Sequence, residues 1–199
     1  MGAVRETKRS DSAPRRVLGI DPGTRCAGWG VVERRGRGFV AIGHGAFVAP
    51  GSVPLPRRLA VIAGGLRRVV EEHAPTEAAI EEAFHGRDAR AALKLGEARG
   101  AFLLLLAEAE IPVTGYANNV VKRAVTGAGR ASKERVRAMV VRLLGLEEPP
   151  ERLDTSDALA LALCHLQRGP ETAAGRAAGG LPPRVQAALR KAKVRGRRR

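Results

Sequence analysis

The sequence predicts an α/β fold, a mixed five-stranded sheet flanked by helices. Three apolar segments with alternating, glycine-spaced patterns, 17–21, 27–33 and 39–49, follow one another across short turns, as in an antiparallel meander. Two further strand segments, 76–84 and 111–117, alternate with helical patterns, as in β/α units. A meander followed by such units predicts a sheet with both antiparallel and parallel neighbours.

The helical patterns have recognisable ends. Pro54 and Pro56 open the first pattern and Pro75 ends it. Ser132 is of the residue type that caps the start of a helix. The expected helical segments are 55–75, 88–110, 120–145 with an internal TGAGR loop, and 153–169.

Two glycines interrupt the long helix predicted over 88–110. Gly96 and Gly100 lie four residues apart and therefore on one face. Each glycine inside a helix costs about 1 kcal/mol relative to alanine, so a close approach of another backbone is the expected reason for them. That backbone belongs either to the same subunit or to a second copy across a helix–helix dimer interface.

The charge is positive and concentrated at the ends of the chain. The 199 residues carry a formal net charge of +15, and the last sixteen hold eight basic residues and no acid. Such a charge favours a polyanionic partner, nucleic acid above all. We expect one folded domain over 15–168, between a disordered N-terminal arm, 1–14, and a Gly/Ala/Pro linker with a basic tail, 169–199.

Cysteine usage and hydropathy predict a cytoplasmic protein. Cys26 and Cys164 stand far apart, with neither the pattern of a disulfide framework nor the spacing of a zinc cluster. The longest apolar run, 101–107, is too short to cross a bilayer. The charged N-terminus lacks the apolar core of a secretion signal.

The stretch GIDPGT at 19–24 ends an apolar strand with a carboxylate, Asp21, and allows two chemistries. In one, the turn cradles a phosphate of a bound nucleotide. In the other, Asp21 is a ligand of a metal site that cuts a phosphodiester. An acid at this position can also serve only to cap the turn.

Further acids stand on other segments. Asp154 and Asp157 share one face at the head of an apolar helix, although the helix dipole alone favours acids there. Glu81 and Glu82 face opposite ways on a strand, and periodicity does not choose between them. Several carboxylates brought together in a basic protein favour bound Mg²⁺, which takes oxygen ligands and can act in pairs on a phosphodiester.

Several motifs together resemble one known family. The segments GIDPGTRCAGWGVV, AIEEAF, ALKLGEARG and VKRAVTGAGRASKERV, followed by LDTSDALALA, are similar to RuvC, the bacterial Holliday-junction endonuclease with a ribonuclease H-like fold. The similarity runs from about Val17 to Leu166 and leaves both basic ends outside. It implies cleavage of four-way DNA junctions by paired symmetric nicks, in recombination and DNA repair, with 5′-phosphate and 3′-hydroxyl ends.

The resemblance also implies site residues and partners. It assigns four acids as catalytic ligands of two Mg²⁺ ions, namely Asp21, Glu81, Asp154 and Asp157. Whether Mn²⁺ can replace Mg²⁺ stays open. It places Lys122 and Lys133 near the scissile phosphates, and Phe84 at the junction crossover, where an aromatic ring can stack on an unpaired base. A homodimer that pairs around the Gly96/Gly100 helix, and work alongside RuvA and RuvB, are implied as well.

Three other functions compete with this interpretation. Actin-like ATPases and sugar kinases also begin with a GID-x-G-T turn, but they need two such domains, for which 199 residues are too few. A non-catalytic junction-binding protein would tolerate the loss of an acid, and all four are present. A YqgF-type nuclease is disfavoured by the context of Lys122 and Lys133 and by the ALKLGEARG helix. Asp21 is therefore expected to bind metal.

Overall fold

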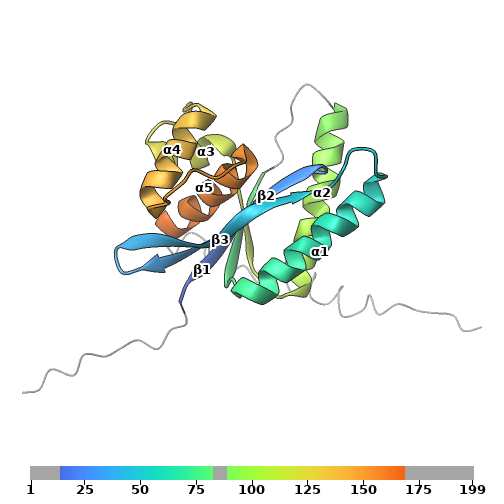
Figure 1. The fold of residues 1–199 in the computed structure, drawn as a ribbon, viewed down its shortest axis with the longest axis horizontal. Coiled ribbons are helices and arrows are strands. Elements are labelled where there is room, and N and C mark those ends of the chain that lie inside the picture. Colours follow the sequence, from blue (N-terminus) through green and yellow to red (C-terminus); the bar gives the residue numbers. More distant parts are fainter. Residues whose placement is uncertain (1–13, 83–88, 169–199) are drawn as a thin grey trace, which may run out of the picture.

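A sheet of five strands runs through the centre of the protein (Figure 1). The strands are β1 (Arg16–Asp21), β2 (Cys26–Arg35), β3 (Gly38–Val48), β4 (Glu77–Glu81) and β5 (Val113–Tyr116). They lie in the order β3-β2-β1-β4-β5, in which the first three pair antiparallel and β1, β4 and β5 pair parallel. The mixed sheet predicted from the sequence is therefore confirmed.

Helices cover both faces of this sheet (Figure 1). They are α1 (Leu55–His73), α2 (Ala89–Glu108), α3 (Asn118–Thr126), α4 (Lys133–Leu144) and α5 (Leu153–Gln167). The computed structural model describes residues 14–82 and 89–168, so the predicted tail and all of the predicted N-terminal arm except Pro14 lie outside the described residues. In the described part, none of the helices combines the length and apolar character needed to span a membrane.

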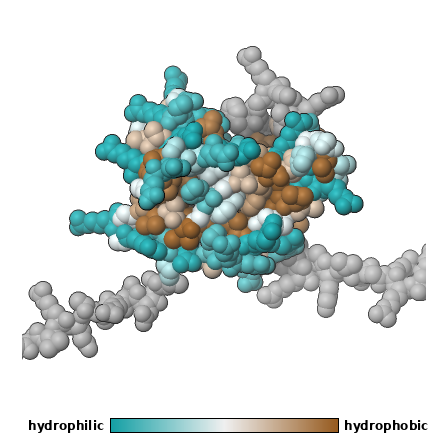
Figure 2. Space-filling view, in the orientation of Figure 1, coloured by the Kyte–Doolittle hydropathy of each residue, from teal (hydrophilic) through white to brown (hydrophobic). Residues whose placement is uncertain are grey.

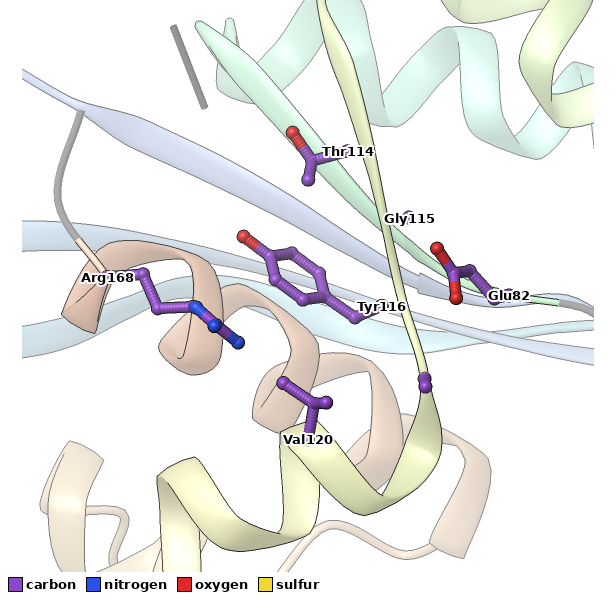
Figure 3. Close-up of a pocket in the computed structure, with 7 residues that line it drawn as sticks. Glu82, Thr114, Gly115, Tyr116, Val120 and Arg168 are labelled. Carbon is purple, nitrogen blue, oxygen red and sulfur yellow. The ribbon is translucent and has the colours of Figure 1, made fainter. Parts of the chain in front are cut away.

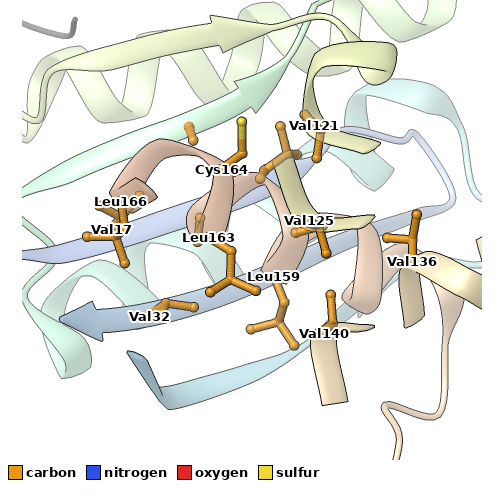
Figure 4. Close-up of a cluster of buried hydrophobic side chains, with 14 of the residues drawn as sticks. Val17, Val32, Val121, Val125, Val136, Val140, Leu159, Leu163, Cys164 and Leu166 are labelled. Carbon is orange, nitrogen blue, oxygen red and sulfur yellow. The ribbon is translucent and has the colours of Figure 1, made fainter. Parts of the chain in front are cut away.

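The alternation of side chains along the strands divides the core into two layers. Val17 on β1 and Val32 on β2 pack with the buried residues of α3, α4 and α5, as Figure 4 shows. Leu18 and Ile20 point to the other face and pack with α1 and α2. Because successive strand residues alternate between faces, Gly19 and Asp21 belong to the face that α5 covers.

Glycines let α5 lie directly against the sheet. A Cβ atom added to Gly19 would stand 1.9 Å from the main-chain oxygen of Ala158, and one added to Gly28 would stand 2.0 Å from that of Asp154. Both distances are far below any real contact, so only glycine fits at these two positions. The glycines of β1 and β2 therefore fix how closely the helix that carries two of the predicted acids approaches the strands.

Several predicted boundaries differ from the observed ones. The strand expected over 76–84 runs from Glu77 to Glu81, Glu82 still donates a main-chain hydrogen bond of 2.9 Å to Tyr116, and residues 83 and 84 lie outside the described part. The helix expected from residue 120 begins at Asn118. The capping prediction is confirmed, since the hydroxyl of Ser132 accepts a hydrogen bond of 3.3 Å from the main-chain nitrogen of Arg135.

The two glycines of α2 meet no neighbour. A Cβ atom added to Gly96 or Gly100 would find nothing within 4 Å in the described residues, so the expected close packing inside the subunit is absent there. Leu93 and Leu104, on the same helix face, are 67% and 61% exposed. The space-filling view likewise shows hydrophobic patches between hydrophilic ones on the face that it presents (Figure 2).

A buried polar network joins the last helix to the sheet. His165 is 1% exposed and lies 2.9 Å from the hydroxyl of Tyr116 and 2.7 Å from a carboxylate oxygen of Glu77. The guanidinium of Arg15 donates two hydrogen bonds to the same carboxylate. His165 thus belongs to the core, and its polar atoms are paired there.

Candidate active site

Two acids stand at the ends of adjacent parallel strands. Asp21 is the last residue of β1 and Glu81 the last of β4, and both follow residues of the α5 face by two positions. The two carboxyl groups lie close enough for the charge of Glu81 to help raise the pKa of Asp21. Parallel pairing of β1 and β4 therefore brings together side chains that lie sixty residues apart in the sequence.

The other two acids come from the beginning of α5. Asp154 and Asp157 lie in its first two turns, and the contact of the Asp154 backbone with Gly28 presses this end of the helix against β2. The hydroxyl of Thr155 donates a hydrogen bond of 3.0 Å to the main-chain oxygen of Gly45 and ties the same turn to β3. The helix start is thus fixed to two strands.

The four carboxylates repel one another across a shared space. Burial and the negative charges of Glu81, Asp157 and Asp154 raise the pKa of Asp21 to about 8. Burial also raises the pKa of Asp157, although Lys133 opposes the shift. Without a cation, the raised pKa favours the protonated form of Asp21 at neutral pH, first because the carboxyl is buried and then because other acids surround it.

Two predicted lysines lie beside this cluster. The ammonium group of Lys133 donates a hydrogen bond of 3.0 Å to Asp157, and this contact raises the pKa of Lys133. Lys122 lines a small hollow together with Glu81 and Asp157. A cation on each side of the acids gives the site two groups that can attract a phosphate.

The structure distinguishes Glu81 from Glu82. Glu82 lies beside Gly115 of the edge strand and lines a hollow of about 330 Å³ to which Glu81 does not contribute (Figure 3). It shares a second hollow with Glu81 and Lys122. Arg168, which also lines that hollow, has its guanidinium 5.8 Å from the ring centre of Tyr116. Of the two neighbouring glutamates, only Glu81 takes part in the interactions of Asp21.

Three contacts to the acids were not anticipated from the sequence. Asn118 donates a hydrogen bond of 2.8 Å to Glu81. The thiol of Cys26 donates one of 3.2 Å to Asp154, and burial together with this carboxylate raises the pKa of Cys26 to about 11. Arg99 of α2 binds the main-chain oxygen of Glu81 at 3.2 Å. The signal available for Asn118 was its place directly after a strand, at the sheet edge that also holds Asp21 and Glu81.

The donor set fits a hard divalent cation in its chemistry. All four acids offer oxygen atoms, which Mg²⁺ prefers, and the proton that Asp21 retains marks negative charge that a cation would balance. Within residues 14–82 and 89–168, no three acidic, histidine or cysteine side chains already stand in a coordinating arrangement. The acids would therefore have to turn toward a common ion as it binds.

Some predicted DNA contacts cannot be placed. Phe84, expected at the junction crossover, lies outside the described residues, as does the loop that holds His85 and Arg87. Among the described candidates, the structure brings the four acids together with Lys133, and Lys122 lies close by.

Curated relatives match most of the chain. A crossover junction endodeoxyribonuclease RuvC from Chloroflexus aggregans is 46% identical over 155 residues, which make up 78% of this chain and 94% of that protein. The protein of the same name from Rhodopseudomonas palustris is 46% identical over 159 residues, or 80% of this chain and 91% of that protein.

Solved structures agree with these relatives. T. thermophilus RuvC in complex with Holliday junction substrate superposes with a TM-score of 0.75 at 35% identity, covering 80% of this chain and 97% of that one. The yeast mitochondrial Holliday junction resolvase Ydc2, at 12% identity and a TM-score of 0.57, shares the fold. The predicted ribonuclease H-like class is thereby confirmed. The family model for crossover junction endodeoxyribonuclease RuvC matches residues 17–165, and the chain therefore belongs to the RuvC family.

Proposed function

We propose that this protein is a structure-selective endonuclease that resolves four-way DNA junctions by paired symmetric nicks, in recombination and DNA repair. Membership of the RuvC family supports the class of reaction. The observation that carries the proposal is the cluster of four carboxylates, in which burial, and after it the negative charges of Glu81, Asp157 and Asp154, raise the pKa of Asp21 to about 8. A purely architectural DNA-binding protein has no need to gather four acids, because buried carboxylates are unfavourable and would repel the phosphates of DNA.

The acids Asp21, Glu81, Asp154 and Asp157 would hold two Mg²⁺ ions. Bound there, two such ions would supply Lewis-acid activation of a water for in-line attack on phosphorus and positive charge at the departing 3′ oxygen, for 5′-phosphate and 3′-hydroxyl ends. Lys133, held at 3.0 Å from Asp157, orients that acid and offers positive charge to the scissile phosphate. Lys122 offers a second cation from α3.

The exposed face of α2 supports the proposal of a homodimer. Leu93, Gly96, Gly100 and Leu104 follow one another at helical spacing, the leucines are exposed, and both glycines leave open space. A second copy that packs its own α2 there would cover the leucines and use the small glycines for a close approach. Two sites related by a two-fold axis then suit paired nicks on opposing strands of a junction.

The cellular setting follows from the family and stays a proposal. We expect the enzyme to act in the cytoplasm together with the RuvA and RuvB branch-migration proteins. The net charge of +15 is consistent with a DNA substrate.

The test is a nicking assay on a synthetic four-way junction with Mg²⁺ or with chelator. Wild type should make paired nicks that disappear with chelator, and Asp21→Asn should bind the junction without cutting it. Glu82→Gln is the matched control, since this neighbouring acid lies outside the cluster and should leave cleavage intact. Tight binding by wild type without any cleavage would instead establish an architectural role and refute the proposed reaction.

A further inference from the structure

Asn118 makes a direct contact with one of the four acids. Its side-chain nitrogen donates a hydrogen bond of 2.8 Å to Oε1 of Glu81, although the two residues lie 37 positions apart in the sequence. The contact arises because Glu81 and Tyr116 are register partners at the ends of the parallel strands β4 and β5, and α3 begins two residues later. The sheet thus sets the two side chains next to each other.

The helix does not require this asparagine. Asparagine is favoured as the capping residue before a helix, but the capping position of α3 is occupied by Ala117, which provides no side-chain hydrogen bond. Asn118 is the first helical residue, and its amide is directed to Glu81 instead of to a free main-chain nitrogen. Helix formation therefore leaves the side chain of Asn118 unexplained, and its contact with the acid cluster explains it.

An amide suits this place better than a cation. Lys133 and Lys122 already bring positive charge to the site, and a further ammonium group directly beside Glu81 would repel an arriving metal ion. The amide of Asn118 carries no charge, so it can restrict the rotation of the Glu81 carboxylate without competing electrostatically for the site. Occupation of Oε1 also restricts the positions that Oε2 can take.

We infer that Asn118 is a positioning residue that holds Glu81 ready for the divalent metal of the active site. This inference rests on the proposed function, because it assumes that the acids bind metal. Groups that hydrogen-bond a metal-ligating carboxylate typically change metal affinity about 10-fold or more when they are removed. Asn118 therefore sets how much Mg²⁺ or Mn²⁺ the site needs, without touching the scissile phosphate.

The experiment compares Asn118→Ala with Asn119→Ala and Asn118→Gln. Asn119 is a matched control, because it is the next residue along the same helix, is equally exposed, and has no side-chain hydrogen bond to the acids in the described part of the chain. Melting temperature is first measured without DNA, in chelator and over a series of Mn²⁺ and Mg²⁺ concentrations. The Mg²⁺ dependence of junction cleavage follows.

In chelator, all variants should melt as wild type does, because helix capping is unaffected. The metal concentration that gives half of the thermal stabilisation should rise about 10-fold for Asn118→Ala. The cleavage midpoint should rise in parallel, while cleavage at saturating metal recovers. Asn119→Ala should match wild type, and Asn118→Gln, which keeps an amide donor, should restore most of the affinity.

Different failures point to different causes. If metal stabilises wild type and Asn118→Ala to the same degree at the same concentrations, the inference is wrong and the proposed function stands. A glutamine variant as impaired as the alanine variant also overturns it, since the amide would then not matter. If no metal stabilises wild type at all, the proposed metal site fails and the positioning role fails with it.

Discussion

Replacement of Gly28 by alanine should displace two of the candidate catalytic acids without touching either of them. Gly28 lies on β2 opposite Asp21, under the first turn of α5. A new Cβ atom would stand 2.0 Å from the main-chain oxygen of Asp154 and 2.2 Å from its carbonyl carbon. Neither atom is the flexible end of a side chain, so the helix start itself has to move.

The size of that movement can be worked out from the contact. Ordinary van der Waals contacts begin near 3.4 Å, so the backbone at Asp154 must retreat by about 1.4 Å from the strand. A misplacement of about 1 Å in a catalytic group can cost on the order of 100-fold in rate. Overpacking of this kind also costs about 1–3 kcal/mol of stability, and each kcal/mol lowers Tm by about 2–4 °C in a domain of this size.

The assay is single-turnover cleavage of a four-way junction, with Tm measured in parallel by calorimetry. Gly38→Ala provides the control, because a Cβ atom there meets only the main-chain oxygen of Arg35, at 3.8 Å. We expect Gly28→Ala to lose about two orders of magnitude in rate at temperatures where it is still folded, and Gly38→Ala to behave as wild type. Wild-type rate and wild-type Tm for Gly28→Ala would refute the idea that this close contact positions the acids.

Two further predictions concern the dimer and the buried network. In Gly96→Ala and Gly64→Ala the new methyl group meets nothing within 4 Å among the described residues, so each change should stabilise its helix by about 1 kcal/mol. Only Gly96→Ala should weaken the dimer in sedimentation equilibrium, and unchanged association would exclude α2 as the interface. Hydrogen bonds from Arg15, opposed in part by burial, lower the pKa of Glu77 from 4.5 to about 2. Because the folded pKa is the lower one, this contribution is present above pH 4.5 and is lost as the pH falls toward 2. Solvent screens the partly exposed pair, so we expect it to be worth about 1 kcal/mol. Urea unfolding of Glu77→Gln should show a weaker acid dependence than wild type over that range, and identical curves would contradict the assignment.

The sequence was informative where a local pattern reflects the environment of a segment. Alternation along 17–21 and 27–33 predicts strands because one face of each meets helices, and the apolar run after Asp157 predicts a helix because nearly all of it is buried. Single acids were harder to assign. Periodicity alone left Glu81 and Glu82 open, and the family resemblance selected Glu81.

Contacts that depend on register lay beyond the sequence. Asn118 meets Glu81 only because Glu81 pairs with Tyr116, and a shift of one residue in that parallel ladder would turn the carboxylate to the other face. Cys26 meets Asp154 only because α5 docks at one height on β2. No local pattern encodes either relation. Both follow from how two distant segments pack together.

The spacing of the glycines in VLGID and AGWGVV explains how closely α5 can pack against these two strands. Gly19 and Gly30 are register partners, and so are Asp21 and Gly28, so the glycines form one patch beside the first acid. Side chains larger than hydrogen would hold α5 away from this patch and so move its carboxylates away from Asp21. In the opening motif, then, Asp21 contributes an acid, and the glycines around it determine how near Asp154 and Asp157 of α5 can come. Conversely, a helix without acids would bring no carboxylate near Asp21 by so close an approach. The glycines of the two strands and the aspartates of α5 therefore contribute to one arrangement.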